Sequence, residues 1–222
     1  MEKGSLYIVA TPIGNLGDLT FRAKEILESV DLIACEDTRH ASILLNHYKI
    51  NKPRLSFHSH SGRTKVDKIM DYLKNGSDVA LISDAGTPGI SDPGYVLIQA
   101  ALDDGVEVIP IPGPSAVITA LCASGLPTDK FLYLGFLPTK KGRQTLFKKI
   151  ADSEYTVVFY ESPHRLIKTL TQLKDFLSPD SKVVVAKELT KIYETFYRGS
   201  ISDVIKQIPE KPKGEYVIMI KS

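Results

Sequence analysis

The chain has 222 residues, of which 43% are hydrophobic, and its formal net charge is +2. A chain of this length and apolar content can bury one large core or two smaller ones, which excludes an intrinsically disordered protein. The charge does not by itself indicate a nucleic-acid binder, because a dedicated one usually has a pI above about 9 and clustered basic residues.

No run of about 18 apolar residues is present, and the N-terminus enters a strand-like segment without a hydrophobic signal region. We therefore expect a soluble, cytoplasmic protein. Cys35 and Cys122 lie in separate apolar runs, which favours buried thiols over a disulfide framework. Two cysteines are too few for a zinc site built from Cys, and we expect no metal.

The first half of the chain alternates short apolar runs with amphipathic segments. Strands are predicted at 6–10, 32–35, 54–57, 79–82 and 106–109, and helices at 21–30, 38–47, 66–73 and 95–102. Strands that are apolar throughout are typical of a parallel sheet covered on both faces. The pattern predicts a mainly parallel α/β lobe.

The Pro-Ile-Pro-Gly-Pro segment at 110–114 interrupts this alternation, and we place a domain boundary there. The expected domains are an N-terminal α/β lobe of residues 1–114 and a C-terminal α/β lobe of residues 115–222. In the second half, strands are predicted at 131–135, 155–160, 182–187, 193–198 and 216–220, and helices at 140–152, 163–177 and 201–208. Two consecutive strands without a helix between them indicate a mixed sheet.

The loop after the first strand, residues 11–18, stands where a nucleotide-binding α/β fold has its phosphate loop. It contains neither G-x-G-x-x-G nor a P-loop lysine, which disfavours NAD and ATP. Ligands are still expected at the carboxyl ends of the parallel strands. The alternative interpretation is an ordinary Pro/Gly turn.

The loop after the fourth strand, residues 83–94, has three glycines and two prolines. Small residues allow backbone to approach a ligand closely, and a loop longer than the usual two to six or so residues is commonly functional. We interpret it as a binding loop, with a purely structural loop as the alternative.

Glu36 and Asp37 follow the second strand and precede Arg39 and His40. Helix capping by Asp37 or Thr38 is the structural alternative, but Arg39 and His40 add groups that can engage an anionic substrate. His58 and His60 are expected near the same rim or in a solvated loop. Without acidic or Cys companions they are not assigned as metal ligands.

Two further segments, 112–116 and 160–165, are each consistent with a helix start but also point to a cleft between the lobes. A basic cluster is predicted on one helix, where it forms a solvated face or contacts an RNA backbone. Its members are Lys140, Lys141, Arg143, Lys148 and Lys149.

Taken in order, residues 9–19, 34–39, 83–94, 112–116 and 160–165 closely resemble the tetrapyrrole methylase superfamily. Within it they resemble the family that methylates a cytidine ribose 2′-hydroxyl of 16S ribosomal RNA. This resemblance implies two α/β lobes, a mainly parallel N-terminal sheet and a mixed C-terminal sheet, with S-adenosyl-L-methionine in the cleft between them. It also implies a homodimer that acts on the small ribosomal subunit.

The resemblance assigns nine residues to the cofactor, partly through their backbone: Ile13, Asp84, Ala85, Gly86, Ile90, Ser115, Ala116, Glu161 and Leu189. As catalytic candidates we take Glu36 and Asp37, which would accept or orient the hydroxyl proton, and Arg39, which would hold a phosphate. Many family members carry a further segment after the last strand, and we expect this chain to function without it.

Other functions remain open at this point. Residues 83–86 depart from the Gly-Gly-Asp-Pro of porphyrin-type relatives, which argues against a tetrapyrrole substrate. A methylase of the same fold for a tetrapyrrole or another small molecule, such as a corrinoid precursor, is still the nearest alternative. A non-catalytic RNA-binding or ribosome-assembly protein and a nucleotide-binding regulatory module are the others.

Overall fold

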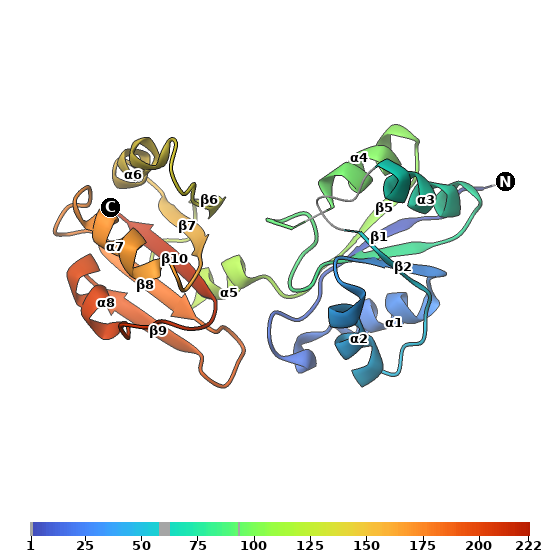
Figure 1. Ribbon diagram of the computed structural model, residues 1–222, viewed down its shortest axis with the longest axis horizontal. Helices are drawn as coiled ribbons and strands as arrows, with labels where there is room; N and C mark the ends of the chain where they lie inside the picture. Colours follow the sequence, from blue (N-terminus) through green and yellow to red (C-terminus); the bar gives the residue numbers. More distant parts are fainter. Residues whose placement is uncertain (1, 58–62, 93) are drawn as a thin grey trace. The chain divides into compact units, whose positions relative to one another are not determined.

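The computed structural model describes residues 2–57, 63–92 and 94–222 (Figure 1). The chain separates into two compact units, Met1–Ser115 and Ala116–Ser222. In the described part of the chain, no helix is long and apolar enough to cross a membrane.

The first unit is built on a five-stranded sheet in the order β3-β2-β4-β1-β5. Its strands are β1 (Leu6–Val9), β2 (Leu32–Cys35), β3 (Arg54–Ser56), β4 (Val79–Ile82) and β5 (Val108–Ile111). Every neighbouring pair is parallel, which confirms the predicted parallel sheet. β5 starts two residues later than the predicted 106 and includes Pro110, which the sheet tolerates because β5 is an edge strand.

Helices cover both faces of this sheet. α1 (Phe21–Ser29) and α2 (Thr38–His47) lie on one face, and α3 (Arg63–Lys74) and α4 (Tyr95–Asp103) lie on the other (Figure 1). A hydrophobic core lies on each face of the sheet, and alternate residues of one strand pack into different cores because successive strand side chains point to opposite faces. Ile33 packs with the α1 and α2 side and Ala34 with the α3 and α4 side.

The helix placement creates a switch point at the carboxyl edge of the sheet. β1 and β2 lead into helices on one face, whereas β4, which lies between them, leads into α4 on the opposite face. Loops that leave in opposite directions from adjacent strands open a crevice where α/β proteins bind ligands. A short 3-10 helix, η1 (Leu16–Asp18), lies in the loop that leaves β1.

The second unit contains a mixed sheet in the order β6-β7-β10-β8-β9. Its strands are β6 (Phe131–Phe136), β7 (Thr156–Glu161), β8 (Lys182–Lys187), β9 (Thr195–Gly199) and β10 (Tyr216–Lys221). β6 and β7 are parallel and the other neighbours are antiparallel, which confirms the prediction of a mixed sheet.

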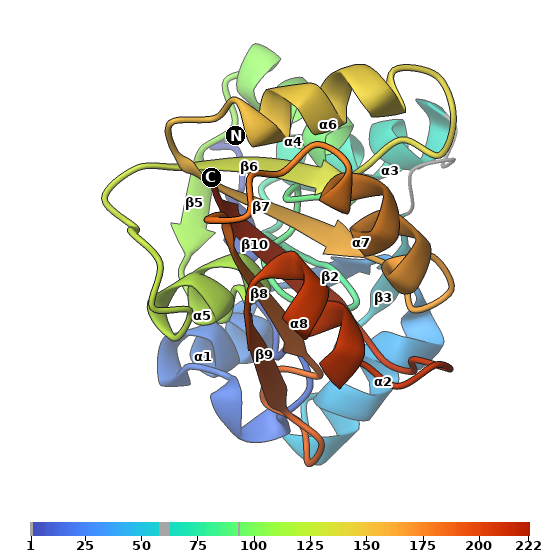
Figure 2. The same ribbon diagram turned by 90° about the vertical axis from the view of Figure 1, so that its left-hand side faces the viewer.

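Helices α6 (Arg143–Ala151), α7 (Leu166–Lys174) and α8 (Ile201–Gln207) cover one face of this sheet (Figure 2). Phe147, Leu170 and Val204 of these helices share a core with Phe159 and Ile218 of the strands. α7 is shorter than the predicted 163–177, because a turn precedes it. A further helix, α5 (Ala116–Cys122), contacts β10 and begins at the end of the 112–116 segment, where a helix start was one of the two interpretations.

Candidate functional site at the strand ends

The loops after β1 and β4 are joined by a backbone bridge between Thr11 and Gly86. The amide of Thr11 donates to the Gly86 carbonyl at 2.9 Å, and the amide of Gly86 donates to the Thr11 carbonyl at 3.0 Å. The buried Thr11 hydroxyl also donates to the Ser83 carbonyl at 3.2 Å. These bonds hold the two glycine-containing loops together at the switch point.

Gly86 is required by the geometry of this bridge. Its φ of +80° lies in the left-handed region that favours glycine. A Cβ on Gly86 would lie 3.4 Å from Ile13 Cγ2 and 3.9 Å from the Pro114 carbonyl oxygen. The structure therefore places Ile13 and Gly86, which the resemblance assigns to the cofactor, next to Pro114 of the 112–116 segment.

The segment after β5 also approaches β1 closely. A Cβ on Gly113 would lie 3.0 Å from the Cβ of Ala10, and the Thr87 hydroxyl donates to the Pro114 carbonyl at 3.4 Å. Ser115 ends the first unit and Ala116 begins the second. Ala85 and Ile90 are exposed on the loop after β4, so their side chains are accessible to a ligand.

Acidic residues of the loops that follow β2 and β4 lie close to one another. The amide of Asp37 donates to the Asp84 carboxylate at 3.2 Å, which ties the two loops together. Burial and the nearby Glu36 and Asp84 carboxylates raise the pKa of Asp92 to about 6. The sequence predicted that the loop carrying Asp92 binds a ligand but did not single out Asp92 itself, since only the fold shows that Glu36 lies near it.

Asp37 caps α2, as the structural alternative proposed. Its carboxylate accepts from the Arg39 amide at 2.8 Å and pairs with the Arg39 guanidinium, with Nη2 to Oδ2 at 2.8 Å and Nε to Oδ1 at 3.2 Å. These bonds from Arg39 lower the pKa of Asp37 to about 2. Asp37 is therefore a weak proton acceptor at neutral pH, and the exposed Arg39 is held by it.

The two cysteines differ. Cys35 is buried, and burial raises the pKa of its thiol to about 11, so it stays neutral beside the acidic groups. Cys122 is exposed, so the expectation of a buried thiol was wrong there, because it lies at the end of α5 and outside the face that buries Val117, Ala120 and Leu121. Among the residues described, no group of three His, Cys, Asp or Glu side chains could hold a metal.

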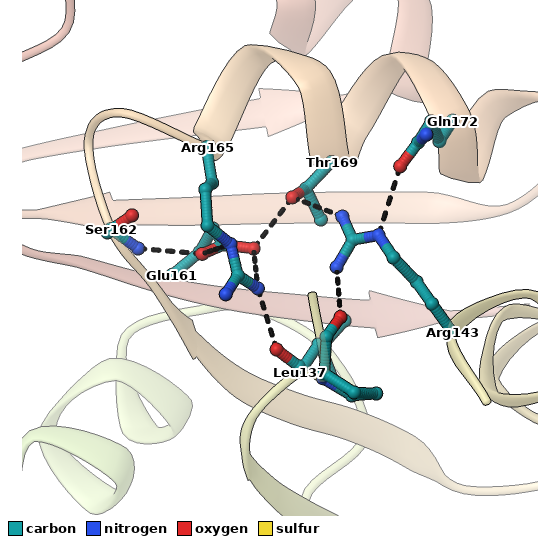
Figure 3. Close-up of polar contacts among 8 residues, drawn as sticks. Leu137, Arg143, Glu161, Ser162, Arg165, Thr169 and Gln172 are labelled. Atoms are coloured by element: carbon teal, nitrogen blue, oxygen red, sulfur yellow. Dashed lines mark hydrogen bonds and ion pairs between the residues drawn. The ribbon is translucent and has the colours of Figure 1, made fainter. Parts of the chain in front are cut away.

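In the second unit, Glu161 at the end of β7 is the centre of a buried polar network (Figure 3). Its carboxylate accepts from the Ser162 amide at 2.8 Å, from Arg165 Nε at 2.9 Å and Nη2 at 3.0 Å, and from Thr169 Oγ1 at 2.6 Å. Both carboxylate oxygens are engaged, so Glu161 fixes the turn that follows β7.

Arg143 extends this network and does not belong to the solvated basic face that the sequence predicted. Its guanidinium donates to Thr169 Oγ1 at 2.7 Å, to the Pro138 carbonyl at 2.9 Å and to Gln172 Oε1 at 3.0 Å (Figure 3). Arg143 is only 8% exposed. Lys140 and Lys141 precede α6, so the predicted helix 140–152 starts too early, and these lysines are exposed with Lys148 and Lys149.

Leu189 lies in a strained turn after β8. The flanking residues Glu188 and Thr190 have φ values of 51° and 66°, which non-glycine residues rarely adopt. Among the described residues, the buried Thr190 hydroxyl has no hydrogen-bond partner. Such strain clusters at active sites, ligand clamps and switch regions. Because β7 and β8 both run antiparallel to β10, Glu161 and Leu189 lie at the same edge of the sheet.

The structure places Glu36 next to Asp37 and near Asp92, and it leaves His40 exposed at the start of α2. His58 and His60 lie outside the described residues. The cofactor assignments of the nine residues stay predictions, now with Ile13, Asp84 and Gly86 on joined loops.

Comparisons with known proteins agree with this architecture. The profile of the family described as tetrapyrrole (corrin/porphyrin) methylases matches residues 5–205. The chain is 51% identical to the ribosomal RNA small subunit methyltransferase I of Synechocystis over 98% of this chain and 78% of the relative. It is 44% identical to the protein of that name from Thermotoga maritima over 98% of both chains.

A solved structure shares the fold at much lower identity. The uroporphyrin-III C-methyltransferase of Thermus thermophilus, in complex with S-adenosylhomocysteine, is 17% identical, with a TM-score of 0.67 over 97% of both chains. This likeness confirms the predicted fold class, with a parallel first sheet and a mixed second sheet.

Proposed function

Because the chain belongs to the tetrapyrrole methylase family, we propose that it transfers a methyl group from S-adenosyl-L-methionine to a cytidine ribose 2′-hydroxyl in 16S ribosomal RNA. The observation that carries this proposal is its 51% identity, over 98% of the chain, to a relative named for small-subunit ribosomal RNA methylation. The proposed partner is accordingly the small ribosomal subunit, which places the reaction in the cytoplasm.

The joined loops of the first unit suit the cofactor. The bridge places Ile13 against Gly86, with Ile13 Cγ2 3.4 Å from the position of a Cβ on Gly86, and the same loop exposes Ala85 and Ile90 to a bound molecule. We propose that Ile13, Asp84, Ala85, Gly86 and Ile90 contact S-adenosyl-L-methionine from this unit.

We propose further contacts from the last residue of the first unit and, in the second unit, from the first residue of α5, the last residue of β7 and the turn after β8. Glu161 has both carboxylate oxygens occupied, so its contribution is to hold the backbone of the turn. The strained turn around Leu189 is consistent with a ligand clamp. The proposed contacts are Ser115, Ala116, Glu161 and Leu189.

In the proposed reaction the cofactor supplies an electrophilic methyl group, and the chain supplies positioning. Well-oriented reactants gain about 7 to 11 kcal/mol from proximity, whereas a positioned base adds roughly 10²- to 10⁴-fold. Arg39 retains its Nη1 donors for a phosphate, because Asp37 uses Nε and Nη2. Arg39 thus has a substrate-binding role, and Asp37 orients it.

The proposal is tested with purified small subunits that lack the modification. We expect label to pass from S-adenosyl-L-methionine to the subunit RNA and to map to a ribose that resists alkaline cleavage. Transfer to a tetrapyrrole but not to the subunit would instead support a small-molecule methylase. Cofactor binding by calorimetry separates both from a non-catalytic assembly protein.

We also propose a homodimer, in keeping with the resemblance that the sequence showed. Sedimentation equilibrium at micromolar concentration tests it directly. A single species with twice the mass of the 24.5 kDa chain is expected, and a monomer would contradict the proposal.

A further inference from the structure

Three aromatic side chains meet near the carboxyl ends of the parallel strands β6 and β7. The ring centroids of Tyr133 and Tyr160 are 5.4 Å apart, and those of Phe136 and Tyr160 are 5.5 Å apart. Phe159 packs into the core beneath α6, α7 and α8, so the next side chain, Tyr160, points to the opposite face of the sheet. We call Tyr133, Phe136 and Tyr160, which lie on that opposite face, the aromatic platform.

A β-bulge turns Phe136 onto this face. Tyr133 pairs with Val158 and Phe136 pairs with Tyr160, so β6 has one more residue than β7 between the two pairs. Without the extra residue, Tyr133 and Phe136 would point to opposite faces of the sheet. Gly135 lies in the bulge with a left-handed φ of 60°, which glycine adopts without strain. Bulges that redirect a side chain occur at sheet edges and next to active sites, and β6 is an edge strand.

Phe136 presents its ring to solvent. It is 58% exposed although it contacts Tyr160, so much of the ring stays available to another planar group. Proteins commonly stack unpaired bases on aromatic side chains of a sheet surface, because every base has a π-face. A stacked base would also cover apolar surface that the fold leaves in water.

The buried polar network of the second unit anchors the backbone that follows Phe136 (Figure 3). The Leu137 carbonyl accepts from Arg165 Nη2 at 2.7 Å, and the Pro138 carbonyl accepts from Arg143 Nη1 at 2.9 Å. These two bonds join the end of β6 to the first residue of α6 and to the residue before α7. The backbone is therefore fixed from the residue directly after Phe136.

Two basic side chains follow this anchored segment. Lys140 and Lys141 are exposed, and three residues lead from Pro138 to Lys141, a span of at most about 11 Å. Ammonium groups at this range from a stacking ring suit single-stranded RNA, in which a charged backbone accompanies the bases. The adenine of a cofactor would use the ring without the lysines, so the combination favours RNA.

We propose that the aromatic platform is an RNA-binding site, in which an unpaired base of the substrate stacks on Phe136 while Lys140 and Lys141 contact neighbouring phosphates. This inference rests on the proposed function, and it adds substrate contacts in the second unit to that of Arg39 in the first. Stacking and phosphate contacts carry little sequence information. The platform therefore contributes affinity for unpaired RNA and little preference for a particular base.

The stacking contact is tested by binding of unmodified small ribosomal subunits. Phe136→Ala should raise their dissociation constant about 5- to 150-fold, the range that corresponds to the loss of one stacked base. Phe136→Trp should retain binding, whereas Phe136→Leu should lose most of the same affinity because leucine is apolar but has no π-face. Tyr155→Ala is the matched control and should bind like the wild type. Tyr155 is 43% exposed and precedes β7, at the opposite edge of the sheet.

The phosphate contacts are tested by the salt dependence of the same binding. Lys140→Ala and Lys141→Ala should each make the slope of log K against log salt shallower by about 0.7, the value for one phosphate of a single strand. Lys182→Ala removes an exposed charge at the start of β8, at the opposite edge, and should leave the slope unchanged. Calorimetry should give the wild-type dissociation constant of S-adenosyl-L-methionine for every variant, which also shows that each variant is folded.

Wild-type affinity of Phe136→Ala or of Phe136→Leu for small subunits overturns the stacking site and leaves the proposed methyl transfer intact. Weaker binding of S-adenosyl-L-methionine by a folded Phe136→Ala variant, with normal subunit binding, assigns the platform to the cofactor and overturns the proposal as well. Unchanged slopes in both lysine variants overturn the phosphate contacts. If Phe136→Ala does not fold, the comparison of Phe136→Trp with Phe136→Leu decides. A wild type that neither binds nor methylates small subunits overturns the proposed function itself.

Discussion

Thr11 and Gly86 exchange two backbone hydrogen bonds, of 2.9 and 3.0 Å, across the carboxyl ends of the neighbouring strands β1 and β4. These residues are 75 positions apart in sequence. The bridge makes the loop with Ile13 and the loop with Asp84 and Asp92 one structural element. A change at Gly86 is therefore expected to displace both loops, and with them the residues proposed to bind the cofactor from the first unit.

Gly86→Val should raise the dissociation constant of S-adenosyl-L-methionine more than about 10-fold, because a β-branched side chain would meet Ile13 at a position with φ of +80°. The control is Gly105→Val in the same unit, where φ is +68° and only Lys3 Nζ lies within 4 Å of a Cβ.

Both glycine variants should lose stability by about 1 to 2 kcal/mol from the left-handed conformation. Calorimetric titration of the two folded variants measures the difference in cofactor binding. Equal affinities would show that the loop after β4 does not contact the cofactor.

Thr169→Val should destabilise the second unit by about 1 to 3 kcal/mol, since it removes a buried hydroxyl that links Arg143 to Glu161. Valine has nearly the shape of threonine, so packing is preserved. Thr169→Ser retains the hydroxyl and should cost less. Urea unfolding of the two variants compares them, and equal midpoints would show that this hydroxyl contributes no net stability.

Arg39→Ala should weaken binding of small subunits while leaving cofactor affinity unchanged. If Nη1 of Arg39 contacts a phosphate, the slope of log K against log salt should become shallower by about one contact. Lys68→Ala on α3 removes an exposed positive charge from a helix and is the matched control. A salt slope equal to that of the wild type would exclude the phosphate contact.

Asp92→Asn should be more stable than the wild type at neutral pH. Burial and two carboxylates raise the pKa of Asp92 from 3.8 to about 6, so the contribution of this carboxyl to stability is fully present below about pH 4 and is lost as pH rises through 6.

The size of this effect follows from the shift. Raising a pKa by two units costs about 3 kcal/mol of folding free energy at neutral pH when the group is shielded from water. Solvent screening of this half-buried carboxyl reduces the cost to roughly 1 kcal/mol. Thermal unfolding should show that Asp92→Asn is more stable than the wild type at pH 7 and that this difference in stability decreases toward pH 4. An advantage that is independent of pH would contradict a raised pKa.

The sheets and most helices followed from hydrophobic periodicity. Strands such as β2 and β4 are apolar throughout because helices cover both of their faces, and this pattern is visible without a structure. Periodicity did not decide for α5, because its seven residues are few and the Pro/Gly segment before them fitted both a crossover and a helix start. It also placed β5 two residues early, because Pro110 argued against a strand that an edge position allows.

The sequence predicted which loops form the candidate site but not which partners surround their side chains. Glycines and prolines marked the loop after β4, yet the partners of its residues come from distant parts of the chain. Because arginine is charged, Arg143 was predicted to lie on a solvated helix face. Only the fold shows that Thr169 and Gln172 accept hydrogen bonds from its guanidinium in a buried position. In the same way, Asp37 and Asp92 are alike in sequence, and their different neighbours give them opposite pKa shifts.

The most direct test of the central claim is single-turnover methyl transfer from labelled S-adenosyl-L-methionine to small ribosomal subunits that lack 2′-O-methylation, followed by mapping of the label. We expect one labelled cytidine ribose in 16S ribosomal RNA and no transfer to tetrapyrroles. Label on a base or on a tetrapyrrole, or no transfer by a protein that binds the cofactor, would contradict it.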